Sequence, residues 1–353
     1  MTTTLRLEAD PARLDTAESR QALARAAEIL RAGGLVAMPT ETVYGLGANA
    51  LDADAVARIF AAKQRPSWDP LIVHIAGRPS SSPMLEPLIG EIPESARKLM
   101  SAFWPGPLTL LLPRSAAVPD AITAGRPLVG IRMPAHRVAF ELIQLAGVPV
   151  AAPSANLFGH TSPTTAQHVL ENLDGRIDAV VDSGPTRHGV ESTVLDPTRR
   201  PMIIYRPGAI TAEQISAVAG AVEIFKAGET ADQEPRQSLP SPGAGVRHYA
   251  PRARLILFDV PLTELPLRLA EAAATRASDR IGLMLPVELA ADSMGATEVF
   301  LWGRWSAPEE LARNLYAGLH TLDRAGCTMI LCPLPPEGGL GTAIRDRLRK
   351  AAG

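Results

Sequence analysis

Residues 227–253, which read AGETADQEPRQSLPSPGAGVRHYAPRA, form the sharpest change of composition in the 353-residue chain. The segment is dense in proline, glycine, serine and charged residues, and its apolar residues follow neither a helix nor a strand period. Such a segment cannot bury a core of its own, so it predicts a linker. The chain is long enough for about two domains. We therefore expect one domain over 1–226 and another over 254–353.

The chain before the linker alternates between helix-type and strand-type periodicity. Leu23, Ala26, Ala27 and Leu30 repeat at the helix period, and two glycines end that helix before the apolar run LVAM. This alternation predicts an α/β or α+β domain built around a sheet. The expected strands are 35–38, 71–75, 108–112, 128–132, 148–152, 178–182, 191–196 and 202–205, and the expected helices are 17–32, 53–62, 94–103, 136–146, 164–171 and 211–218.

The chain after the linker has a simpler pattern. Apolar strand-type segments at 254–260, 281–285 and 328–333 alternate with helix-type segments near 262–275 and 307–321. This order is typical of parallel βα units, so the second domain is predicted to be doubly wound.

The overall charge and hydropathy exclude several classes of protein. Lys and Arg number 35 and Asp and Glu 37, so the formal charge is 35 − 37 = −2, which argues against a protein that mainly coats nucleic acid. A local basic site could still hold phosphates. No apolar run approaches the roughly 18 residues of a membrane helix. The N-terminal MTTTLRLEADPARLD lacks the apolar core of a signal peptide, so we expect a cytoplasmic protein without a membrane contact.

The two cysteines, Cys327 and Cys332, are too few for a thiolate metal site. We interpret them as small apolar residues around a strand and predict no dedicated protein metal site.

The segment PTETVYGLGANA at 39–50 follows a predicted strand and carries hydroxyl and carboxyl side chains with two glycines. A loop of this composition at a strand end presents backbone and side-chain hydrogen-bonding groups to a ligand. Gly45, Gly47 and Ala50 also match G-x-G-x-x-A, but six residues separate the strand from Gly45. That spacing disfavours a dinucleotide site. No Walker loop occurs in the sequence.

The segment KQRPSWDPLIVH at 63–74 places Lys63 and Arg65 at the end of a helix, before a proline-stiffened loop and a strand. Arg offers a planar fork and Lys a point charge, which together suit phosphate binding and phosphoryl transfer. Two cations at a helix C-terminus can also be purely structural. His74 lies in an otherwise apolar strand, where it is either a satisfied core residue or part of a site.

Three later segments repeat the pattern of polar residues after an apolar strand. They are VGIRMP with Arg132, PVAAPSANLFGHTSPT with Ser154, Asn156 and Ser162, and ESTVLD with Ser192 followed by IIYRPG with Arg206. Each alone could be turn chemistry. As a set, four cations and several hydroxyls without an evident nucleophile indicate a site for an anionic nucleotide and a small polar co-substrate. Catalysis there would depend on positioning and charge stabilisation.

At these residues the chain resembles the threonylcarbamoyl-AMP synthase family, which has the YrdC-type fold, in its long form with an extra C-terminal domain. The segments PTETVYGLGANA, KQRPSWDPLIVH, WPGPLTLLL, VGIRMP, APSAN, ESTVLD and IIYRPG occur in the family's order and spacing. The linker segment SPGAGVRHYAP is similar to the SPG…HYAP segment of the long form. The resemblance implies a twisted mixed sheet with a large basic cleft and a smaller Rossmann-like C-terminal domain.

The resemblance also implies an activity. Family members convert L-threonine, bicarbonate and ATP into threonylcarbamoyl-AMP and pyrophosphate. The product serves N6-threonylcarbamoyladenosine formation at position 37 of ANN-reading tRNAs. This implies Mg²⁺ bound with ATP, delivery of the product to the tRNA threonylcarbamoyl transferase machinery, and at most a weak contact with tRNA itself.

Carried over to matching positions, the resemblance assigns residues to two substrates. Threonine would be surrounded by Thr42, His74, Arg132, the Ala152 backbone and Ser192. ATP would be held by Lys63, Arg65, Asp69, Ser154, Asn156, Ser162, Arg206 and Tyr249, with Lys63 and Arg65 also catalytic. Many relatives have Thr or Ser where Leu128 stands here, so an ATP contact at Leu128 would use backbone atoms.

Two other functions are compatible with the same residues. YrdC-like domains resemble double-stranded RNA binders, although the charge of −2 and the low aromatic content disfavour a binding module. A carbamoyl transferase acting on another acceptor would use similar chemistry, but it normally carries zinc-finger modules, and this sequence has no Cys-rich finger.

Overall fold

The computed structural model describes residues 3–225, 248–275, 279–289 and 296–353. These residues form two compact units. The described part of unit 1 comprises 3–158, 163–187 and 191–225, and that of unit 2 comprises 159–162, 188–190 and the described residues from 248 onward. Positions 227–247 of the predicted linker lie outside the described residues.

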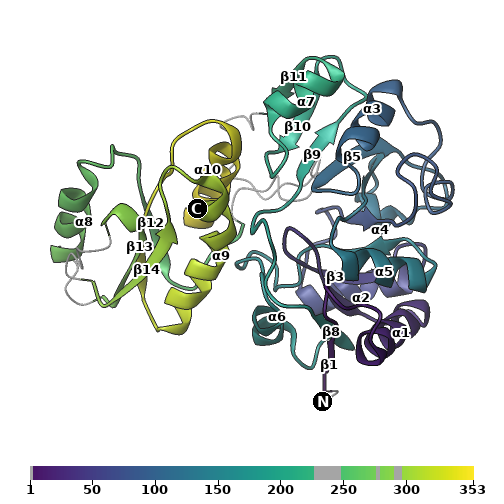
Figure 1. Cartoon of the computed structure of the whole chain (residues 1–353), viewed down its shortest axis with the longest axis horizontal. Coiled ribbons are helices and arrows are strands. Elements are labelled where there is room, and N and C mark those ends of the chain that lie inside the picture. The colour runs from purple at the N-terminus through teal and green to yellow at the C-terminus, as the bar shows by residue number, and fades with distance from the viewer. Residues whose placement is uncertain (1–2, 226–247, 276–278, 290–295) are drawn as a thin grey trace. The chain divides into compact units, whose positions relative to one another are not determined.

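Unit 1 contains a mixed sheet of 11 strands (Figure 1). Across the sheet the order is β1-β8-β2-β3-β7-β4-β6-β5-β9-β10-β11, with parallel and antiparallel neighbours interspersed. The strands are β1 (Leu5–Glu8), β2 (Val36–Pro39), β3 (Tyr44–Asn49), β4 (Ile72–His74), β5 (Leu108–Pro113), β6 (Leu128–Arg132), β7 (Val150–Ala151), β8 (Ala179–Asp182), β9 (Thr193–Asp196), β10 (Met202–Arg206) and β11 (Val222–Ile224).

Several helices of unit 1 begin at a residue whose side chain caps the helix. Asp52 accepts hydrogen bonds from the backbone N–H groups of Asp54 and Ala55 at the start of α2, and Thr211 forms a capping box at the start of α7. The described helices are α1 (Ala17–Arg31), α2 (Ala53–Lys63), α3 (Glu94–Phe103), α4 (Asp120–Thr123), α5 (Arg137–Ala146), α6 (Ala166–Leu173) and α7 (Ala212–Ala219).

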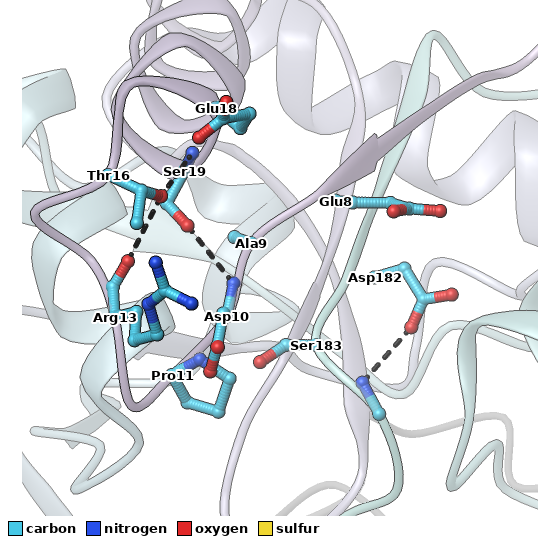
Figure 2. Close-up of a pocket in the computed structure, with 11 residues that line it drawn as sticks. Glu8, Ala9, Asp10, Pro11, Arg13, Thr16, Glu18, Ser19, Asp182 and Ser183 are labelled. Atoms are coloured by element: carbon cyan, nitrogen blue, oxygen red, sulfur yellow. Dashed lines mark hydrogen bonds between the residues drawn. The ribbon is translucent and has the colours of Figure 1, made fainter.

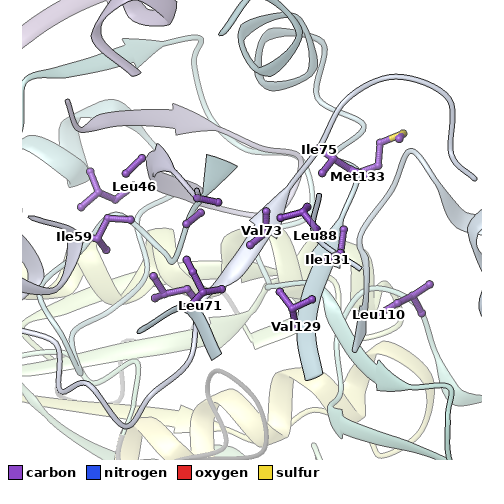
Figure 3. Packing of buried hydrophobic residues seen from close by; sticks show 14 of the residues in the cluster. Leu46, Ile59, Leu71, Val73, Ile75, Leu88, Leu110, Val129, Ile131 and Met133 are labelled. Carbon is purple, nitrogen blue, oxygen red and sulfur yellow. The ribbon is translucent and has the colours of Figure 1, made fainter. Parts of the chain in front are cut away.

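The largest apolar core lies on one face of the central strands (Figure 3). Val73 of β4, Leu110 of β5, and Val129 and Ile131 of β6 are fully buried there. Because side chains alternate between the two faces of a strand, a slip of one residue would expose this whole set, so the core fixes the register. It also fixes which residues the strands present on the opposite face.

The opposite face of these strands carries a much smaller apolar cluster. Ile72, Leu111 and Val194 form it, and Leu128 packs against it. Beyond this cluster the strands end in polar residues, which build the site described below.

Unit 2 contains a parallel sheet of four strands in the order β12-β15-β13-β14 (Figure 1). The helix α8 packs on one face with the apolar side chains of β13 and β15, whereas α9 packs on β14 and against α10. Its described elements are β12 (Arg254–Phe258), α8 (Leu265–Ala274), β13 (Ile281–Pro286), a 3₁₀ turn (Val287–Leu289), β14 (Glu298–Gly303), α9 (Pro308–Arg324), β15 (Met329–Pro333) and α10 (Gly339–Ala352).

The fold class predicted from the sequence is confirmed. Unit 1 is a mixed sheet with covering helices, and unit 2 is a parallel sheet with helices on both faces, as in Rossmann-like domains. Among the described helices, none combines the length and the apolar character that a membrane span requires.

One local prediction is wrong. The segment 39–50 was expected to be a ligand-binding loop, but Tyr44–Asn49 is the buried strand β3 and only the turn at 40–43 remains a loop. A Cβ at Gly45 would lie 3.2 Å from the Cβ of Ala152, and one at Gly47 would lie 2.9 Å from Cγ1 of Val150. Both glycines therefore serve close sheet packing rather than a dinucleotide.

Candidate functional site

Five polar residues from neighbouring strands of unit 1 form what we call the polar row: His74, Arg132, Thr109, Ser192 and Arg206. They come from β4, β6, β5, the residue before β9, and β10, which are successive neighbours in the sheet. His74 and Arg132 are register partners, so their side chains share a face. A Cβ at Gly130 would meet the Thr109 side chain at 3.4 Å, which places Thr109 on the face of Gly130 and Arg132.

A β-bulge brings Arg206 into the polar row. Ile204 lies in the main core, and strict alternation would send Arg206 to the same side. The register between β9 and β10 shifts between Ile204 and Arg206, however, so that Arg206 pairs with Val194. Bulges redirect side chains in this way. The result is that Arg206 reaches Ser192.

Arg132 has its guanidinium fixed on three sides. Nη1 donates to Oγ1 of Thr42 at 2.9 Å, Nε donates to the carbonyl of Gly106 at 3.3 Å, and Nη2 lies 2.7 Å from Oε1 of Glu41. Both charged side chains are at least nine-tenths buried. Burial alone would raise the pKa of Glu41, but the ion pair with Arg132 outweighs it and leaves that pKa below its usual value. The pair therefore stays ionised.

The turn 40–43 holds Thr42 in place for this contact. Thr40 Oγ1 lies 2.8 Å from Thr42 Oγ1, donates to the carbonyl of Val43 at 2.6 Å and accepts the backbone N–H of Thr42. These local bonds rigidify the turn. Both hydroxyls are buried.

His74 is a buried neutral imidazole beside this ion pair. Burial lowers the pKa of His74 to about 3, and the nearby Arg132 charge lowers it further, against the opposing effect of Glu41. Its Nδ1 has no hydrogen-bond partner among the described residues. An unpaired polar atom in such a position is costly unless something satisfies it. His74 is therefore suited to exchange a hydrogen bond with a bound molecule.

Ser192 lies between Thr109 and Arg206 in the polar row. Its Oγ lies 2.8 Å from Oγ1 of Thr109 and accepts a hydrogen bond of 3.1 Å from Nη2 of Arg206. Arg206 also donates to the Ser192 carbonyl through Nε at 3.1 Å and Nη2 at 3.0 Å. The Ser192 hydroxyl is thus held from two directions and is 1% exposed.

A second group, which we call the cation cluster, consists of Lys63, Arg65 and Asp69. Lys63 is the last residue of α2, and Gln64 turns the chain away with φ of 52°. Arg65 then forms an ion pair of 2.9 Å with Asp69 and donates to the carbonyls of Asp69 and Pro70. Its guanidinium also lies 5.8 Å from the centre of the Phe158 ring.

The electrostatics of the cation cluster are dominated by burial. Burial lowers the pKa of Lys63 well below its usual value, and the neighbouring Arg65 adds to that effect. Burial likewise raises the pKa of Asp69, although the charges of Arg65, Lys63 and Arg206 oppose this. Arg206 therefore acts on Asp69 while it bonds to Ser192. This member of the polar row is therefore close enough to the cation cluster for its charge to act there.

The segment after β7 closes the site around Lys63. Nζ of Lys63 donates to the carbonyls of Ser154 at 2.6 Å and Asn156 at 2.5 Å. The Asn156 side chain donates to the carbonyl of Leu157 at 2.8 Å. The Ala152 N–H donates to the Ile72 carbonyl at 2.9 Å, which places Ala152 beside β4 and near His74 in the sheet.

Unit 1 thus brings together ten of the predicted site residues: Thr42, Lys63, Arg65, Asp69, His74, Arg132, Ser154, Asn156, Ser192 and Arg206, with the Ala152 backbone beside them. Leu128 is not among them. It begins β6, about 13 Å from Arg132 at about 3.3 Å per residue, and packs in the small apolar cluster.

Ser162 and Tyr249 belong to unit 2. The Ser162 carbonyl lies 3.1 Å from Nε2 of His320, and Tyr249 accepts a hydrogen bond at its carbonyl from Thr161 at 3.3 Å. The Arg347 guanidinium lies 5.1 Å from the centre of the Tyr249 ring. Their assignment to ATP stays a prediction.

Sequence reasoning missed Glu41 and Thr109. Glu41 stands inside PTETVY, and a carboxylate beside a hydroxyl turn could have been paired with one of the four predicted cations, because buried charges need partners. Thr109 in WPGPLTLLL also carried a signal, because it is a polar residue inside an otherwise apolar strand.

A separate hollow of about 500 Å³ opens in unit 1 near the ends of β1 and β8 (Figure 2). Its lining includes Glu8, Asp10, Arg13 and Asp182. No member of the polar row or the cation cluster lines it.

The fold and the site define an α/β protein that holds hydroxyls, an imidazole and two arginines on one sheet face, with Lys63 and Arg65 supplied by the end of α2 and the loop after it. This arrangement suits a small polar molecule beside a phosphate-bearing one. The family described as Telomere recombination matches residues 28–208, and the family described as Threonylcarbamoyl-AMP synthase, C-terminal domain matches residues 210–353. The chain belongs to the threonylcarbamoyl-AMP synthase family.

Individual relatives agree over nearly the whole length. The threonylcarbamoyl-AMP synthase of Pyrococcus abyssi is 47% identical over 93% of this chain and 93% of its own, and that of Bacillus subtilis is 45% identical over 94% and 93%. The crystal structure of P. abyssi Sua5 complexed with L-threonine superposes with a TM-score of 0.88, at 43% identity, over 99% of this chain and 98% of that one.

Proposed function

We propose that this protein is an L-threonylcarbamoyladenylate synthase. It combines L-threonine, bicarbonate and ATP to give threonylcarbamoyl-AMP and pyrophosphate. The proposal is supported by the position of Arg206, which bonds to Ser192 and lies close enough to Asp69 for its charge to act on that carboxylate, since the reaction needs an amino acid and a nucleotide side by side. The names of the full-length relatives support it as well.

The polar row is the proposed threonine subsite. Arg132 pairs with the threonine carboxylate, a geometry that favours guanidinium over ammonium. Thr42 and the Ser192 hydroxyl recognise the threonine hydroxyl. A subsite built from buried hydroxyls penalises an amino acid without that group, because its own hydrogen-bonding atoms would be left unpaired.

The cation cluster is the proposed triphosphate subsite. In its ammonium form, which the negative charge of a bound triphosphate favours, Lys63 uses two of its three donors on the Ser154 and Asn156 carbonyls and has one left for a phosphate oxygen. Arg65 and Arg206 add positive charge near Asp69. Mg²⁺ enters bound to the triphosphate and is part of the substrate.

The chemistry then requires no protein nucleophile. The threonine amine attacks bicarbonate, and loss of water gives a carbamate. A carbamate oxygen attacks the α-phosphorus, the bond to the β-phosphate oxygen breaks, and pyrophosphate leaves with its negative charge. Lys63 and Arg65 stabilise the charge that develops on the leaving group. His74, held neutral by burial, accepts or donates a hydrogen bond at the amine without adding charge.

The product is an unstable mixed anhydride, so it must be passed on quickly. We propose that the tRNA threonylcarbamoyl transferase machinery receives it in the cytoplasm, for modification of ANN-reading tRNAs.

The experiment is an assay of pyrophosphate release by the purified full-length chain. ATP, threonine and bicarbonate together should release pyrophosphate, and omission of threonine or of bicarbonate should reduce the rate to background. Release that is the same with and without threonine would refute the proposal.

A further inference from the structure

Unit 2 has a topological switch point between β12 and β15. The two strands are parallel neighbours. The chain after β12 leads to α8 on one face of the sheet, whereas the chain after β15 leads to α10, which packs with α9 on the other face (Figure 1). In open parallel sheets, diverging connections leave a crevice at the carboxyl ends of the two strands, and ligands bind there.

A hollow of about 470 Å³ lies at this point. The segments directly after β12 and β15 line it, together with Trp305 and Arg345 from elsewhere in unit 2. The residues of the two segments are Asp259, Val260, Pro261, Leu262, Leu334, Pro335, Pro336 and Glu337. Its volume is within the range of about 300–1,000 Å³ that is usual for small-molecule sites. The lining combines apolar side chains with the polar side chains of Asp259, Glu337 and Arg345.

Polar groups in the hollow are held in fixed positions. Arg345 of α10 donates to Asp259 through Nη2 and to the Pro335 carbonyl through Nη1 at 2.8 Å, while its Nε has no partner among the described residues. The Arg345 side chain is 7% exposed, whereas that of Asp259 is 58% exposed. A carboxylate fixed by a buried arginine at a strand end, yet open to solvent, is suited to accept hydrogen bonds from a pair of ligand hydroxyls.

Trp305 supplies an aromatic surface. It is half-buried, its backbone N–H donates to the Glu288 carboxylate at 2.9 Å, and its ring packs edge-on against buried Trp302 at 6.4 Å. These contacts hold the indole in place. Planar ligand rings stack on such aromatic faces.

The helix α10 starts beside the hollow. Glu337 lines the hollow, Gly338 caps the helix with φ of 97°, and the helix continues for 14 residues. A Cβ at Gly341 would lie 2.1 Å from the Pro336 carbonyl, so only glycine lets the loop after β15 fold back against the helix start. The first N–H groups of such a helix have no intrahelical partner and favour an anion.

We propose that this hollow is a second binding site, for a nucleoside monophosphate. The base stacks on Trp305, the ribose hydroxyls bond to the Asp259 carboxylate, and the phosphate lies at the start of α10. The site is confined to unit 2 and shares no residue with the polar row or the cation cluster, so it goes beyond the proposed function.

The test uses the full-length protein and 8-azido-AMP as a photoreactive probe. Labelled peptides are mapped by mass spectrometry, which distinguishes labelling in unit 2 from labelling by a nucleotide bound in unit 1. We expect labelling of peptides that contain Trp305 or residues 334–345, and suppression of that labelling by unlabelled AMP. Asp259→Asn should lower it at least tenfold, and Trp305→Leu should lower it as well. Asp279→Asn, which removes a carboxylate just before β13, at the amino end of that strand and away from the carboxyl ends that line the hollow, is the matched control and should leave it unchanged.

Competition with adenosine and with inorganic phosphate shows which parts of AMP the site recognises. Adenosine should compete at least fivefold more weakly than AMP because it lacks the phosphate, and inorganic phosphate alone should not compete at equal concentration. Absence of unit 2 labelling, equal labelling of wild type and Asp259→Asn, or competition by phosphate as strong as by AMP would each overturn the proposal. Pyrophosphate release in unit 1 is measured independently, so a failure of one proposal is distinguishable from a failure of the other.

Discussion

The hydroxyl oxygens of Thr109 and Ser192 lie 2.8 Å apart in the polar row, with no measurable exposure for Thr109 and 1% for Ser192. Arg206 donates to the same Ser192 oxygen, so this hydroxyl already has two partners in unit 1. The Thr109 contact therefore restricts the directions in which Ser192 can offer its remaining hydrogen-bonding capacity. Thr109 is a positioning residue for the proposed recognition of threonine.

Thr109→Val should reduce discrimination between threonine and alanine. The change preserves the volume but removes one buried hydrogen bond, worth about 0.5–1.5 kcal/mol, so the ratio of kcat/KM for threonine over alanine should fall about threefold to tenfold. Ser192→Ala should reduce the ratio further. Thr4→Val removes another buried hydroxyl, bonded to the Ile177 carbonyl, and is the control that should change stability but not the ratio. An unchanged ratio in Thr109→Val would remove it from the site.

Arg65→Ala should slow pyrophosphate release about tenfold to a thousandfold, as expected when a group that stabilises developing charge is lost. Because the change also leaves Asp69 without its ion-pair partner, Arg65→Lys is needed beside it. The lysine keeps a charge and loses the planar fork, so it should recover part of the rate. Arg58→Ala, on the preceding helix α2 and paired with Asp178, should behave as wild type. Full activity of Arg65→Ala would show that Arg65 has no part in the reaction.

Glu41→Gln should destabilise the protein by about 3 kcal/mol or more, because it leaves the buried Arg132 charge uncompensated. Asp182→Asn, which breaks a partly exposed pair with Arg6, should cost only about 0–1 kcal/mol. Saturating threonine should raise the unfolding temperature of Glu41→Gln more than that of wild type, since its carboxylate supplies the missing charge. Equal increases in the two proteins would argue against a carboxylate at Arg132.

The neutral state of His74 predicts a pH dependence of stability. The pKa is about 3 in the folded protein and 6.5 for an ordinary histidine, so between these values the unfolded chain binds a proton that the folded protein does not. The free energy of unfolding must then fall as the pH decreases below about 6.5, with a contribution from His74 of up to about 1.4 kcal/mol per pH unit. Urea unfolding of wild type and His74→Asn from pH 7.5 to 4.5 measures it. Parallel curves for the two proteins would contradict the burial of a neutral imidazole.

Much of the framework could be predicted from the sequence because the central strands are continuous apolar runs. β6 and α3 have the bounds that the periodicity predicted, 128–132 and 94–103. Strands with weaker patterns escaped prediction. β1 has mostly exposed side chains, and β14 lies at a sheet edge with Val299 and Leu301 exposed, so neither shows the burial that makes a strand recognisable.

The segment Tyr44–Asn49 shows a different limit. Two glycines and an asparagine predict a loop from local preference, yet the segment is a strand. Its glycines are needed because neighbouring side chains leave no room for a Cβ. Such contacts join residues about a hundred positions apart and leave no local signal.

The sequence indicated which residues build the site, but not which of these residues contact one another. Arg206 illustrates the reason. Its type and place after a strand indicated an anion site, whereas the bulge that turns it toward Ser192 depends on the register of two strands. Glu41 and Thr109 carry a signal in the sequence, but the residues that they contact become evident only in the folded chain.

The central claim is that the polar row and the cation cluster form one site joined by Arg206. Calorimetric titration of the full-length protein with a non-hydrolysable ATP analogue, with and without saturating threonine, tests it most directly. We predict that threonine tightens analogue binding at least fivefold, a coupling of about 1 kcal/mol, and that Arg206→Ala reduces this coupling while leaving each ligand able to bind. Identical analogue affinity with and without threonine in the wild-type protein would contradict the account.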